Sequence, residues 1–349
     1  MGRQLLNSRP NDPGPPVLVV EDLWIRFNAE GRALQAVGGV SFAVEAGETL
    51  AIVGESGSGK SVTAHAIIGL VDIPPGEITK GDIRFLGQSL LADGGRLARE
   101  VRGREIGMIF QDALAALNPG FSVGYQLAEL FRAHQGLGKR AALARAVELI
   151  DRVGIPNARQ RAGDYPHQLS GGMRQRIAIA MAIALDPAVI IADEPTTALD
   201  VTVQAQIMEL LAKLQAETGA ALILITHDLG LVAAHADRLA VMYASRLVEL
   251  GPARTVFQRP SHPYTVGLLE SVPSRSRDAL ELPAIPGQPP DLANLPPGCA
   301  FQPRCAHSRD RARCLEERPA LQRVDDQQQS ACHFFEELAD RRQRVLAGA

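Results

Sequence analysis

The chain has 349 residues, of which 46% are hydrophobic and 21% are charged, and its formal net charge is −3. These values are typical of a globular protein with a large core, and the low net charge gives no indication of non-specific nucleic-acid binding. No apolar run approaches membrane-spanning length, and the start lacks a charged-then-apolar signal sequence. We therefore expect a cytoplasmic protein that reaches a membrane only through partners.

The first part of the chain predicts a disordered tail followed by strands. Residues 1–16 are rich in Pro, Asn and Gly, a composition typical of disorder. From Val17 to about Leu50, apolar and polar residues alternate, which predicts antiparallel strands.

A glycine-rich loop follows the apolar run Thr49–Val53, which predicts a buried strand. The spacing after the loop predicts a helix that ends between Gly69 and Pro74. Strand, loop and helix in this order are the context of a nucleotide phosphate-binding loop. That loop reads Gly54-Glu55-Ser56-Gly57-Ser58-Gly59-Lys60-Ser61. We expect Lys60 to hold the β- and γ-phosphates and Ser61 to bind Mg²⁺, the alternative being an ordinary glycine-rich turn.

A helical stretch from about residue 113 to 168 leads to a second glycine-rich helix start. Within this stretch Leu143, Val147 and Ile150 share one face, which predicts a packed amphipathic helix. The second loop reads Leu169-Ser170-Gly171-Gly172-Met173-Arg174-Gln175. A helix start favours anions, so each loop serves a different nucleotide, or two copies of the chain sandwich the nucleotides between them.

Two later apolar runs end in residues suited to phosphate chemistry. Ala188–Ala192 predicts a strand that runs into Asp193 and Glu194, and Ala221–Ile225 predicts a strand followed shortly by His227. The carboxyl ends of parallel strands border the crevice where such sheets bind ligands. Asp193 suits Mg²⁺, Glu194 suits the base for an attacking water, and His227 suits a γ-phosphate contact. The alternatives are a solvated acidic strand end and a structural or exposed histidine.

The last segment, rich in Pro and Arg, contains all four cysteines: Cys299, Cys305, Cys314 and Cys332. Disulfides are not expected in a reduced cytosol. Four thiolates can bind Zn²⁺ or an iron–sulfur cluster, although neither the C-x-x-C zinc spacing nor the common ferredoxin spacing is present. Four unligated thiols are the alternative, and His307 and His333 are additional candidate ligands.

These motifs together resemble those of ABC transporter ATPase subunits. The second glycine loop is similar to the ABC signature, and the resemblance extends from about Val17 to Pro260. It implies a Q-loop glutamine, a D-loop aspartate, a switch histidine and an adenine-stacking ring at Gln111, Asp200, His227 and Phe27, with Trp24 as the other nearby ring. It further implies binding of ATP by Phe27, residues Gly54 to Val62, Gln111, Asp193 and Asp200, with Mg²⁺ at Ser61, Gln111 and Asp193. Ser170, Gly171 and Gly172 would contact the ATP of a partner subunit, and Glu194, His227 and Gln111 would be catalytic.

Other stretches are similar to the oligopeptide/dipeptide (peptide/nickel) importer ATPases. They are Phe110–Pro119, Tyr165–Gln168, Ser261–Thr265 with Gly267–Leu269, and Pro297–Phe301 with Pro303–Cys305. The chain departs from that family at Ala113, where Pro is usual, near the expected docking point of a membrane subunit's coupling helix. The shared cysteine pattern implies a structural [4Fe–4S] cluster, with zinc as the second candidate.

The resemblance implies an α/β fold: a P-loop (RecA-like) ABC ATPase core with an antiparallel β-subdomain, an inserted helical subdomain and a loop-rich, cysteine-containing C-terminal extension. The expected boundaries are 17–260 for the ATPase domain, about 113–175 for the helical subdomain and 261–349 for the extension. The implied function is ATP-driven peptide import at the cytoplasmic face of the cell (inner) membrane. The implied partners are two permease subunits, a second, paralogous ATPase and, indirectly, an extracytoplasmic substrate-binding protein, with no nucleic acid.

Three alternatives remain at this stage. The same ATPase type can serve nickel, glutathione or sugar cargo. A soluble ABC ATPase acting on ribosomes or DNA would have two cassettes or long coiled coils, and the sequence shows one cassette and no sustained heptads. A regulatory, noncatalytic cassette would have a damaged signature or strand-end acid, and both are intact here.

Overall fold

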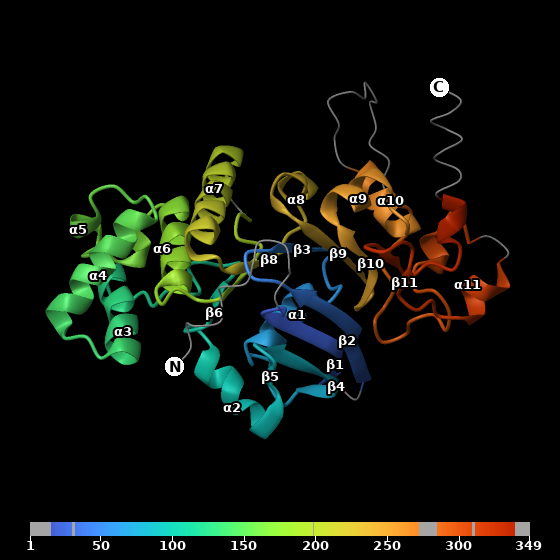
Figure 1. Ribbon diagram of the computed structural model, residues 1–349, viewed down its shortest axis with the longest axis horizontal. Helices are drawn as coiled ribbons and strands as arrows, with labels where there is room; N and C mark the ends of the chain where they lie inside the picture. Colours follow the sequence, from blue (N-terminus) through green and yellow to red (C-terminus); the bar gives the residue numbers. More distant parts are fainter. Residues whose placement is uncertain (1–14, 30–31, 198, 272–284, 309–310, 339–349) are drawn as a thin grey trace. The chain divides into compact units, whose positions relative to one another are not determined.

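The computed structural model describes residues 15–29, 32–197, 199–271, 285–308 and 311–338, which form two compact units (Figure 1). Among the described residues, the first unit takes those within 15–19, 43–48 and 83–224, and the second takes those within 20–42, 49–82 and 225–338. Most of the predicted tail lies outside the described residues.

The division between the units runs through four strands. These are β1 (Leu18–Ala29), β2 (Arg32–Val44), β4 (Gly76–Phe85) and β8 (Ala221–Ile225). In the second unit β2, β1 and β4 lie in this order, and in the first unit the end of β4 pairs antiparallel with β5 (Gln88–Ser89).

The first unit contains most of the helices. They are α2 (Ala92–Val101), α3 (Val123–Gln135), α4 (Lys139–Arg152), α5 (Ala158–Arg161), η1 (Pro166–Gln168), α6 (Gly171–Ile183) and α7 (Val201–Thr218). Helices α3, α4 and α6 contact one another, and Figure 1 shows α3 and α4 side by side. The predicted helical stretch of about 113–168 is therefore confirmed from Val123 onward, whereas residues 113–122 form turns and bends.

The packed face of α4 differs from the prediction. Leu143 is 47% exposed, whereas Ala142, Ala146, Leu149 and Ile150 are buried. Ala142 and Ala146 lie at i and i+4, so they form one stripe along the helix with Leu149 and Ile150. The packed amphipathic helix and the burial of Ile150 are confirmed, but the prediction was wrong for Leu143, because small alanines on the packed face allow α4 to approach its neighbours closely.

Three buried strands of the first unit lie in the order β8, β7 (Val189–Asp193) and β6 (Ile106–Ile109). β6 and β7 are parallel, with Ile109 opposite Ala192, so their carboxyl ends reach the same edge. Gly107 is required in β6, because a Cβ there would lie 2.1 Å from the Ala182 carbonyl oxygen of α6. The strands predicted over 188–192 and 221–225 are confirmed, the former with a shift of one residue.

The second unit contains the phosphate loop and the C-terminal segment, by which we mean the extension that begins at residue 261. Its further elements are β3 (Thr49–Val53), α1 (Lys60–Ile67), α8 (Leu229–His235), β9 (Arg238–Tyr243), β10 (Arg246–Pro252), α9 (Ala253–Gln258), α10 (Pro263–Glu270), η2 (Gln302–Arg304), α11 (Ala312–Glu316), β11 (Gln322–Arg323) and β12 (Gln329–Ser330). Strands lie in the order β11-β12-β10-β9-β3, and β3 is parallel to β9. The strand predicted at Thr49–Val53 is confirmed.

The C-terminal segment shares the core of the second unit. Its Tyr264 and Phe301 are buried against Tyr243 at the end of β9, with ring centroids 4.6 Å and 5.3 Å from that ring. Such aromatic contacts add stability beyond area burial. A short strand, β12, also pairs with β10. The segment is rich in loops, as expected, but aromatic packing and sheet pairing fasten it to the rest of the unit.

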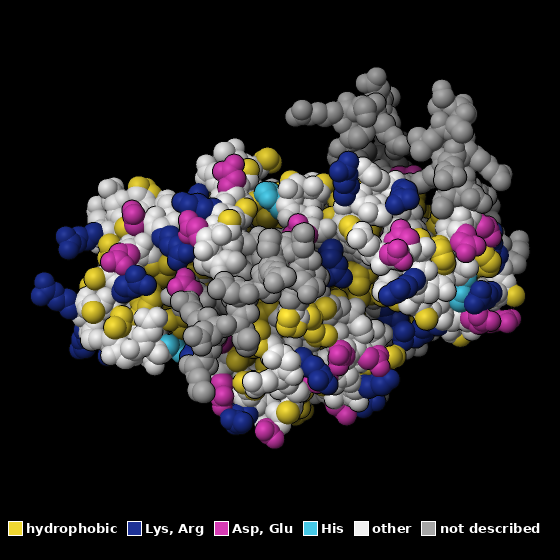
Figure 2. Space-filling model, viewed as in Figure 1, with side chains coloured by type: hydrophobic (Ala, Val, Ile, Leu, Met, Phe, Trp, Pro, Cys, Tyr) yellow, Lys and Arg dark blue, Asp and Glu magenta, His cyan; other side chains and the backbone are white. Residues whose placement is uncertain are grey.

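Charged side chains of both signs are interspersed among hydrophobic ones on the face drawn in Figure 2. Within the described part of the chain, no helix combines the length and the apolar character needed to cross a membrane.

Candidate functional site

The phosphate loop connects β3 to α1 in the second unit, and its glycines are required by sterics. A Cβ on Gly54 would lie 2.1 Å from the Met242 carbonyl oxygen, and one on Gly59 would lie 2.3 Å from the Ala36 carbonyl oxygen. Gly59 also has a φ of 99°, in the region that favours glycine. The loop therefore follows the neighbouring backbone too closely for any side chain at these two positions.

Polar atoms converge inside this loop. The Lys60 ammonium, 7% exposed, donates to the carbonyl oxygens of Gly54 at 2.8 Å and Glu55 at 3.0 Å. The Ser58 hydroxyl is buried and has no hydrogen-bond partner within the described residues. A buried donor without a partner is costly, and a phosphate oxygen would satisfy it. Lys60 and Ser58 thus fit the phosphates of a nucleotide.

The C-terminal segment holds the same loop from outside. The Tyr264 hydroxyl accepts a hydrogen bond from the Glu55 backbone N–H at 3.0 Å. Arg304, whose side chain is 6% exposed, donates to the Glu55 carboxylate at 2.8 Å and to the Tyr243 hydroxyl at 3.3 Å. The Arg304 Nε also donates to the Pro286 carbonyl oxygen. Two residues of the segment therefore fix Glu55, the second residue of the phosphate loop.

The Ser261–Tyr264 stretch has a structural explanation in this arrangement. The buried Glu249 carboxylate of β10 accepts hydrogen bonds from the backbone N–H groups of Ser261 and His262 at 2.7 Å and 3.0 Å. Burial raises the pKa of Glu249. Burial lowers the pKa of His262 to about 3, so the ring is neutral and its Nδ1 accepts from the Tyr264 N–H. These bonds orient Tyr264 toward the phosphate loop.

In the first unit, the strand-end acids lie beside the predicted Q-loop glutamine. Glu194 follows β7, and its Oε2 accepts hydrogen bonds from Gln111 Nε2 at 3.0 Å and from Thr197 Oγ1 at 2.8 Å. The neighbouring Asp193 is 4% exposed. The parallel register of β6 and β7 explains the contact, because each strand ends just before one of the two partners. A carboxylate held this way can orient a water molecule.

The second glycine loop begins α6 in the same unit. The Ser170 hydroxyl caps the helix by accepting from the Met173 N–H. A Cβ on Gly172 would lie 3.0 Å from Val203 of α7. Asp200 caps α7 by accepting from the Val203 N–H at 2.9 Å, so the two helix starts adjoin. Ser170 and Asp200 are exposed.

Other predicted site residues lie as follows. Ser61 and Val62 begin α1 and are half-buried, and Phe27 lies in β1 near Gly76. The Trp24 ring faces the Arg246 guanidinium at 4.9 Å, which occupies that ring and leaves Phe27 as the adenine-stacking candidate. His227, in the second unit, is exposed beyond β8.

The four cysteines are neighbours, although they do not form a site for a single ion. Cys305, Cys314 and Cys332 line one small cavity, and the Cys299 N–H donates to the Cys314 carbonyl oxygen at 2.9 Å. Burial raises the pKa of Cys299 to about 11 and that of Cys332 to about 12. Backbone hydrogen bonds lower these pKa values in part, and the nearby thiols raise them further. No three His, Cys, Asp or Glu side chains among the described residues are arranged to hold a metal ion. The described side chains thus do not form a preformed site for a metal ion.

Sequence reasoning missed the residues that support these motifs. Thr197, Arg304, Tyr264 and Glu249 make their decisive contacts with residues between 3 and 249 positions away. Arg304 and Tyr264 lie in two stretches that resemble the importer ATPases, Pro303–Cys305 and Ser261–Thr265. That resemblance was the signal in the sequence that could have identified them.

Comparisons with known proteins agree with these observations. A family model described as "ABC transporter" matches residues 37–197, and one described as "Oligopeptide/dipeptide transporter, C-terminal region" matches residues 248–314. The chain is 51% identical to the oligopeptide transport ATP-binding protein OppD of Bacillus subtilis, covering 89% of this chain and 86% of that protein. It is 48% identical to the dipeptide transport ATP-binding protein DppD of Escherichia coli, covering 91% and 96%.

Solved structures give the same result. A dimeric ATP-binding cassette in a post-hydrolysis state, bound to ADP and Pi, is 26% identical with a TM-score of 0.61, covering 68% of this chain and 99% of that one. CbiO1 from Clostridium perfringens, part of an ABC transporter complex, is 30% identical with a TM-score of 0.58, covering 72% and 95%. The chain has the α/β fold of an ABC ATPase, and it belongs to the ABC transporter ATP-binding proteins of the oligopeptide/dipeptide importer family.

Proposed function

We propose that this chain binds and hydrolyses ATP to power the import of di- or oligopeptides through a membrane transporter complex. The observation that carries the proposal is the similarity to OppD and DppD, which covers about nine tenths of the chain, together with an intact phosphate loop and intact strand-end acids. The charge pattern and the described helices are consistent with a peripheral subunit at the cytoplasmic face of the membrane.

Nucleotide binding and ATP hydrolysis are assigned to different residues. Lys60, Ser58 and the loop backbone N–H groups would bind the phosphates, Ser61, Gln111 and Asp193 are the candidates to hold Mg²⁺, and Phe27 would stack on the adenine. The Mg²⁺ ion, when bound, neutralises phosphate charge. Glu194 takes the proton of the attacking water, while Gln111 and Thr197 orient its carboxylate through their hydrogen bonds. His227 contacts the γ-phosphate.

The exposed signature indicates a partner ATPase. Ser170 and Gly171 begin a helix whose N-terminus is open to solvent, and anions are stabilised at such a position. We propose that they contact ATP held by a second, paralogous subunit, with Asp200 beside them. Closure of the pair then depends on ATP, and hydrolysis allows it to reopen.

Exposed apolar side chains near the Q-loop are suited to a membrane subunit. Leu114 is 47% exposed, and Phe121 and Tyr125, both more than 40% exposed, stack on each other at 4.9 Å. Ala113, at the position where Pro is usual in the family, is buried. We propose that this surface docks the coupling helix of a permease subunit, so that Gln111 links the nucleotide to it.

The test is peptide uptake by the complex in proteoliposomes. Glu194→Gln keeps the hydrogen bonds but removes the base, so turnover and uptake should fall by about 100-fold or more while ATP binding is retained. Glu209→Gln, an exposed position in α7, is the matched control and should behave as the wild type. ATP-dependent uptake that is unaffected by Glu194→Gln would reject the assigned base, and absence of peptide-stimulated turnover in the wild type would reject the cargo.

We further propose that the four cysteines bind a [4Fe–4S] cluster with a structural role. Supporting observations are the shared cavity of Cys305, Cys314 and Cys332 and the adjacent Cys299. A multi-iron cluster needs four thiolates spread around it, whereas one ion needs its ligands within about 2.3 Å. When bound, the cluster would join helix α11, which contains Cys314, to the loops that contain the other three cysteines.

Anaerobic purification followed by visible absorption and by iron, sulfide and zinc assays tests this site. A broad brown absorbance with iron and sulfide, lost in Cys→Ser variants, is the expected result. Detection of zinc without iron would contradict the cluster and indicate a structural zinc ion. Detection of no metal would contradict both and indicate four free thiols.

A further inference from the structure

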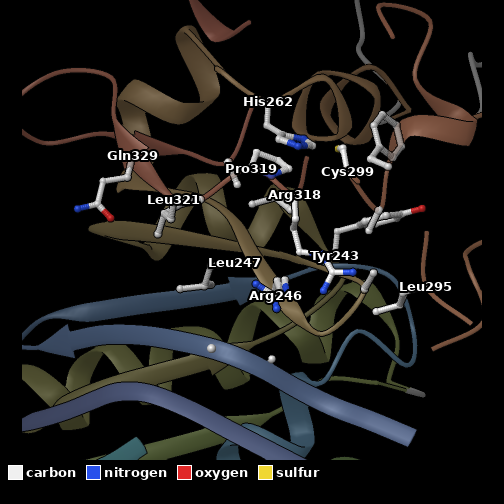
Figure 3. Close-up of a pocket in the computed structure, with 18 of the residues that line it drawn as sticks. Tyr243, Arg246, Leu247, His262, Leu295, Cys299, Arg318, Pro319, Leu321 and Gln329 are labelled. Carbon is white, nitrogen blue, oxygen red and sulfur yellow. The ribbon is translucent and has the colours of Figure 1, made fainter. Parts of the chain in front are cut away.

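A cavity lies where β2 and the start of β10 meet the C-terminal segment, wholly within the second unit. Its volume is about 260 Å³, just below the usual size range of small-molecule sites. Its apolar wall includes Tyr243, Leu247, Leu295 and Phe301, as drawn in Figure 3 for the labelled residues. The cavity has room for a small organic molecule.

Two arginines give this cavity its chemical character. Arg246 from β10 and Arg318 from the C-terminal segment both line it, and Figure 3 shows their side chains extending into the same part of the pocket. Burial, followed by the charge of Arg318, lowers the pKa of Arg246, which indicates that the two cations are close. None of the described residues that line the cavity is acidic.

Among the described residues neither arginine forms a salt bridge with a carboxylate, although the charge of Asp22 acts on Arg246 and partly offsets the lowering of its pKa. Arg246 stacks on the Trp24 ring at 4.9 Å, and Arg318 donates to the Pro296 carbonyl oxygen at 3.1 Å. The nearby Asp22 already pairs with Lys80 and accepts from the Trp24 indole. Two adjacent guanidinium groups of like charge destabilise each other unless an anion lies between them.

The backbone preserves space for one of these cations. A Cβ on Gly38 of β2 would lie 3.3 Å from the Arg246 Nε, so glycine leaves Arg246 its place in the pocket. Gln329 and Ser41 add polar groups to the wall. Arg318 is exposed, so the pocket is accessible from solvent on that side.

We propose that this pocket binds a small phosphomonoester with an apolar or aromatic body. The phosphoryl dianion would neutralise both guanidinium groups, since arginine pairs with phosphate through two parallel hydrogen bonds. The body of the ligand would contact the aromatic and aliphatic wall. A carboxylate has one negative charge and would leave one arginine unbalanced.

The probe is phenyl phosphate, titrated into the full-length chain by calorimetry and by tryptophan fluorescence. Trp24 is the only tryptophan in the chain and contacts Arg246, so its emission reports on the pocket. Saturating MgADP is present throughout, because the pocket residue Tyr243 contacts Arg304, which pairs with Glu55 of the phosphate loop. Binding at the phosphate loop then does not contribute to the signal.

We expect saturable 1:1 binding that Arg318→Gln and Arg246→Gln each weaken by at least about tenfold. Arg313→Gln is the matched control, because Arg313 is exposed, pairs with Glu317 and does not line the pocket. Benzoate should bind more weakly than phenyl phosphate, and phenol should not bind measurably. Circular dichroism spectra should be the same for all the arginine variants.

Three results would overturn the proposal. They are no saturable binding of phenyl phosphate, equal affinity in the wild type and in both pocket variants, or equal affinity for phenyl phosphate and phenol. The last result would make the cavity an apolar pocket in which the arginines have no role.

Discussion

The phosphate loop and the strand-end acids, both assigned to the same reaction, are held in place in different ways. In the loop, Gly54 and Gly59 lie against neighbouring backbone, and buried Arg304 and Tyr264 fix Glu55. At the acids, Glu194 is held by side-chain hydrogen bonds from the exposed Gln111 and the half-buried Thr197. The first arrangement suits a rigid binding site, and the second suits groups that change partners during a catalytic cycle.

The largest expected effect tests the rigidity of the loop. Gly59→Ala places a Cβ 2.3 Å from a backbone oxygen at a positive φ, so we expect a loss of about 3 kcal/mol in unfolding free energy and loss of MgATP binding. Thermal unfolding and nucleotide titration measure both. Gly57→Ala is the control, because its φ is also positive but no atom lies within 4 Å, so about 1 kcal/mol is expected. Equal effects at both positions would mean that steric contact does not constrain the loop.

The next effect tests the role of the C-terminal segment. Arg304→Met removes the donor to the Glu55 carboxylate while keeping a long side chain, and we expect the unfolding free energy to fall by about 2 kcal/mol. The KM for ATP should rise as well, because Glu55 loses its anchor. Arg313→Met breaks an exposed ion pair with Glu317 and should leave the unfolding free energy close to that of the wild type. An unchanged KM in Arg304→Met would show that the contact stabilises the fold without influencing the loop.

A pH dependence of stability follows from buried His262. Its folded pKa of about 3 lies below the ordinary 6.5, so the unfolded chain binds the proton more readily between these values. The stability that neutral His262 provides is complete above about pH 6.5 and is lost as the pH falls toward 3. From pH 7 to pH 5 we expect a loss of up to about 2 kcal/mol from this residue.

Glu249 acts in the opposite direction, because burial raises its pKa and the folded state binds its proton more readily. His262→Asn isolates the histidine contribution, since Asn retains an acceptor for the Tyr264 N–H. Denaturant unfolding at pH 7 and pH 5 should show a smaller decrease in the variant. The same decrease in both proteins would contradict the assignment.

The smallest expected effect concerns the strand-end acid Glu194. Thr197→Val removes the hydrogen bond from the Thr197 hydroxyl to the Glu194 carboxylate, and we expect kcat to fall about fivefold with an unchanged KM for ATP, corresponding to about 1 kcal/mol. Thr202→Val, at an exposed position in α7, is the control. If Thr197→Val lowered the unfolding free energy by more than the activation free energy rises, Thr197 would serve the stability of the fold, as the phosphate-loop contacts do.

The sequence alone determined the elements that carry the nucleotide chemistry. The strands at 49–53 and 221–225, the glycine loop and the strand that ends at Asp193 were all predicted. These features depend on local properties: continuous apolar runs, the backbone freedom of glycine, and the position of polar residues at strand ends. Local periodicity was misleading in α4, where alanines rather than Leu143 are buried, because residue size does not indicate how closely a neighbouring helix approaches.

Only the tertiary structure decided which side chains support the site. Gln111 meets Glu194 across 83 residues, and Arg304 meets Glu55 across 249 residues. The pocket between Arg246 and Arg318 also joins distant segments. No local pattern encodes such contacts, because they depend on strand register and on how the C-terminal segment packs against Tyr243.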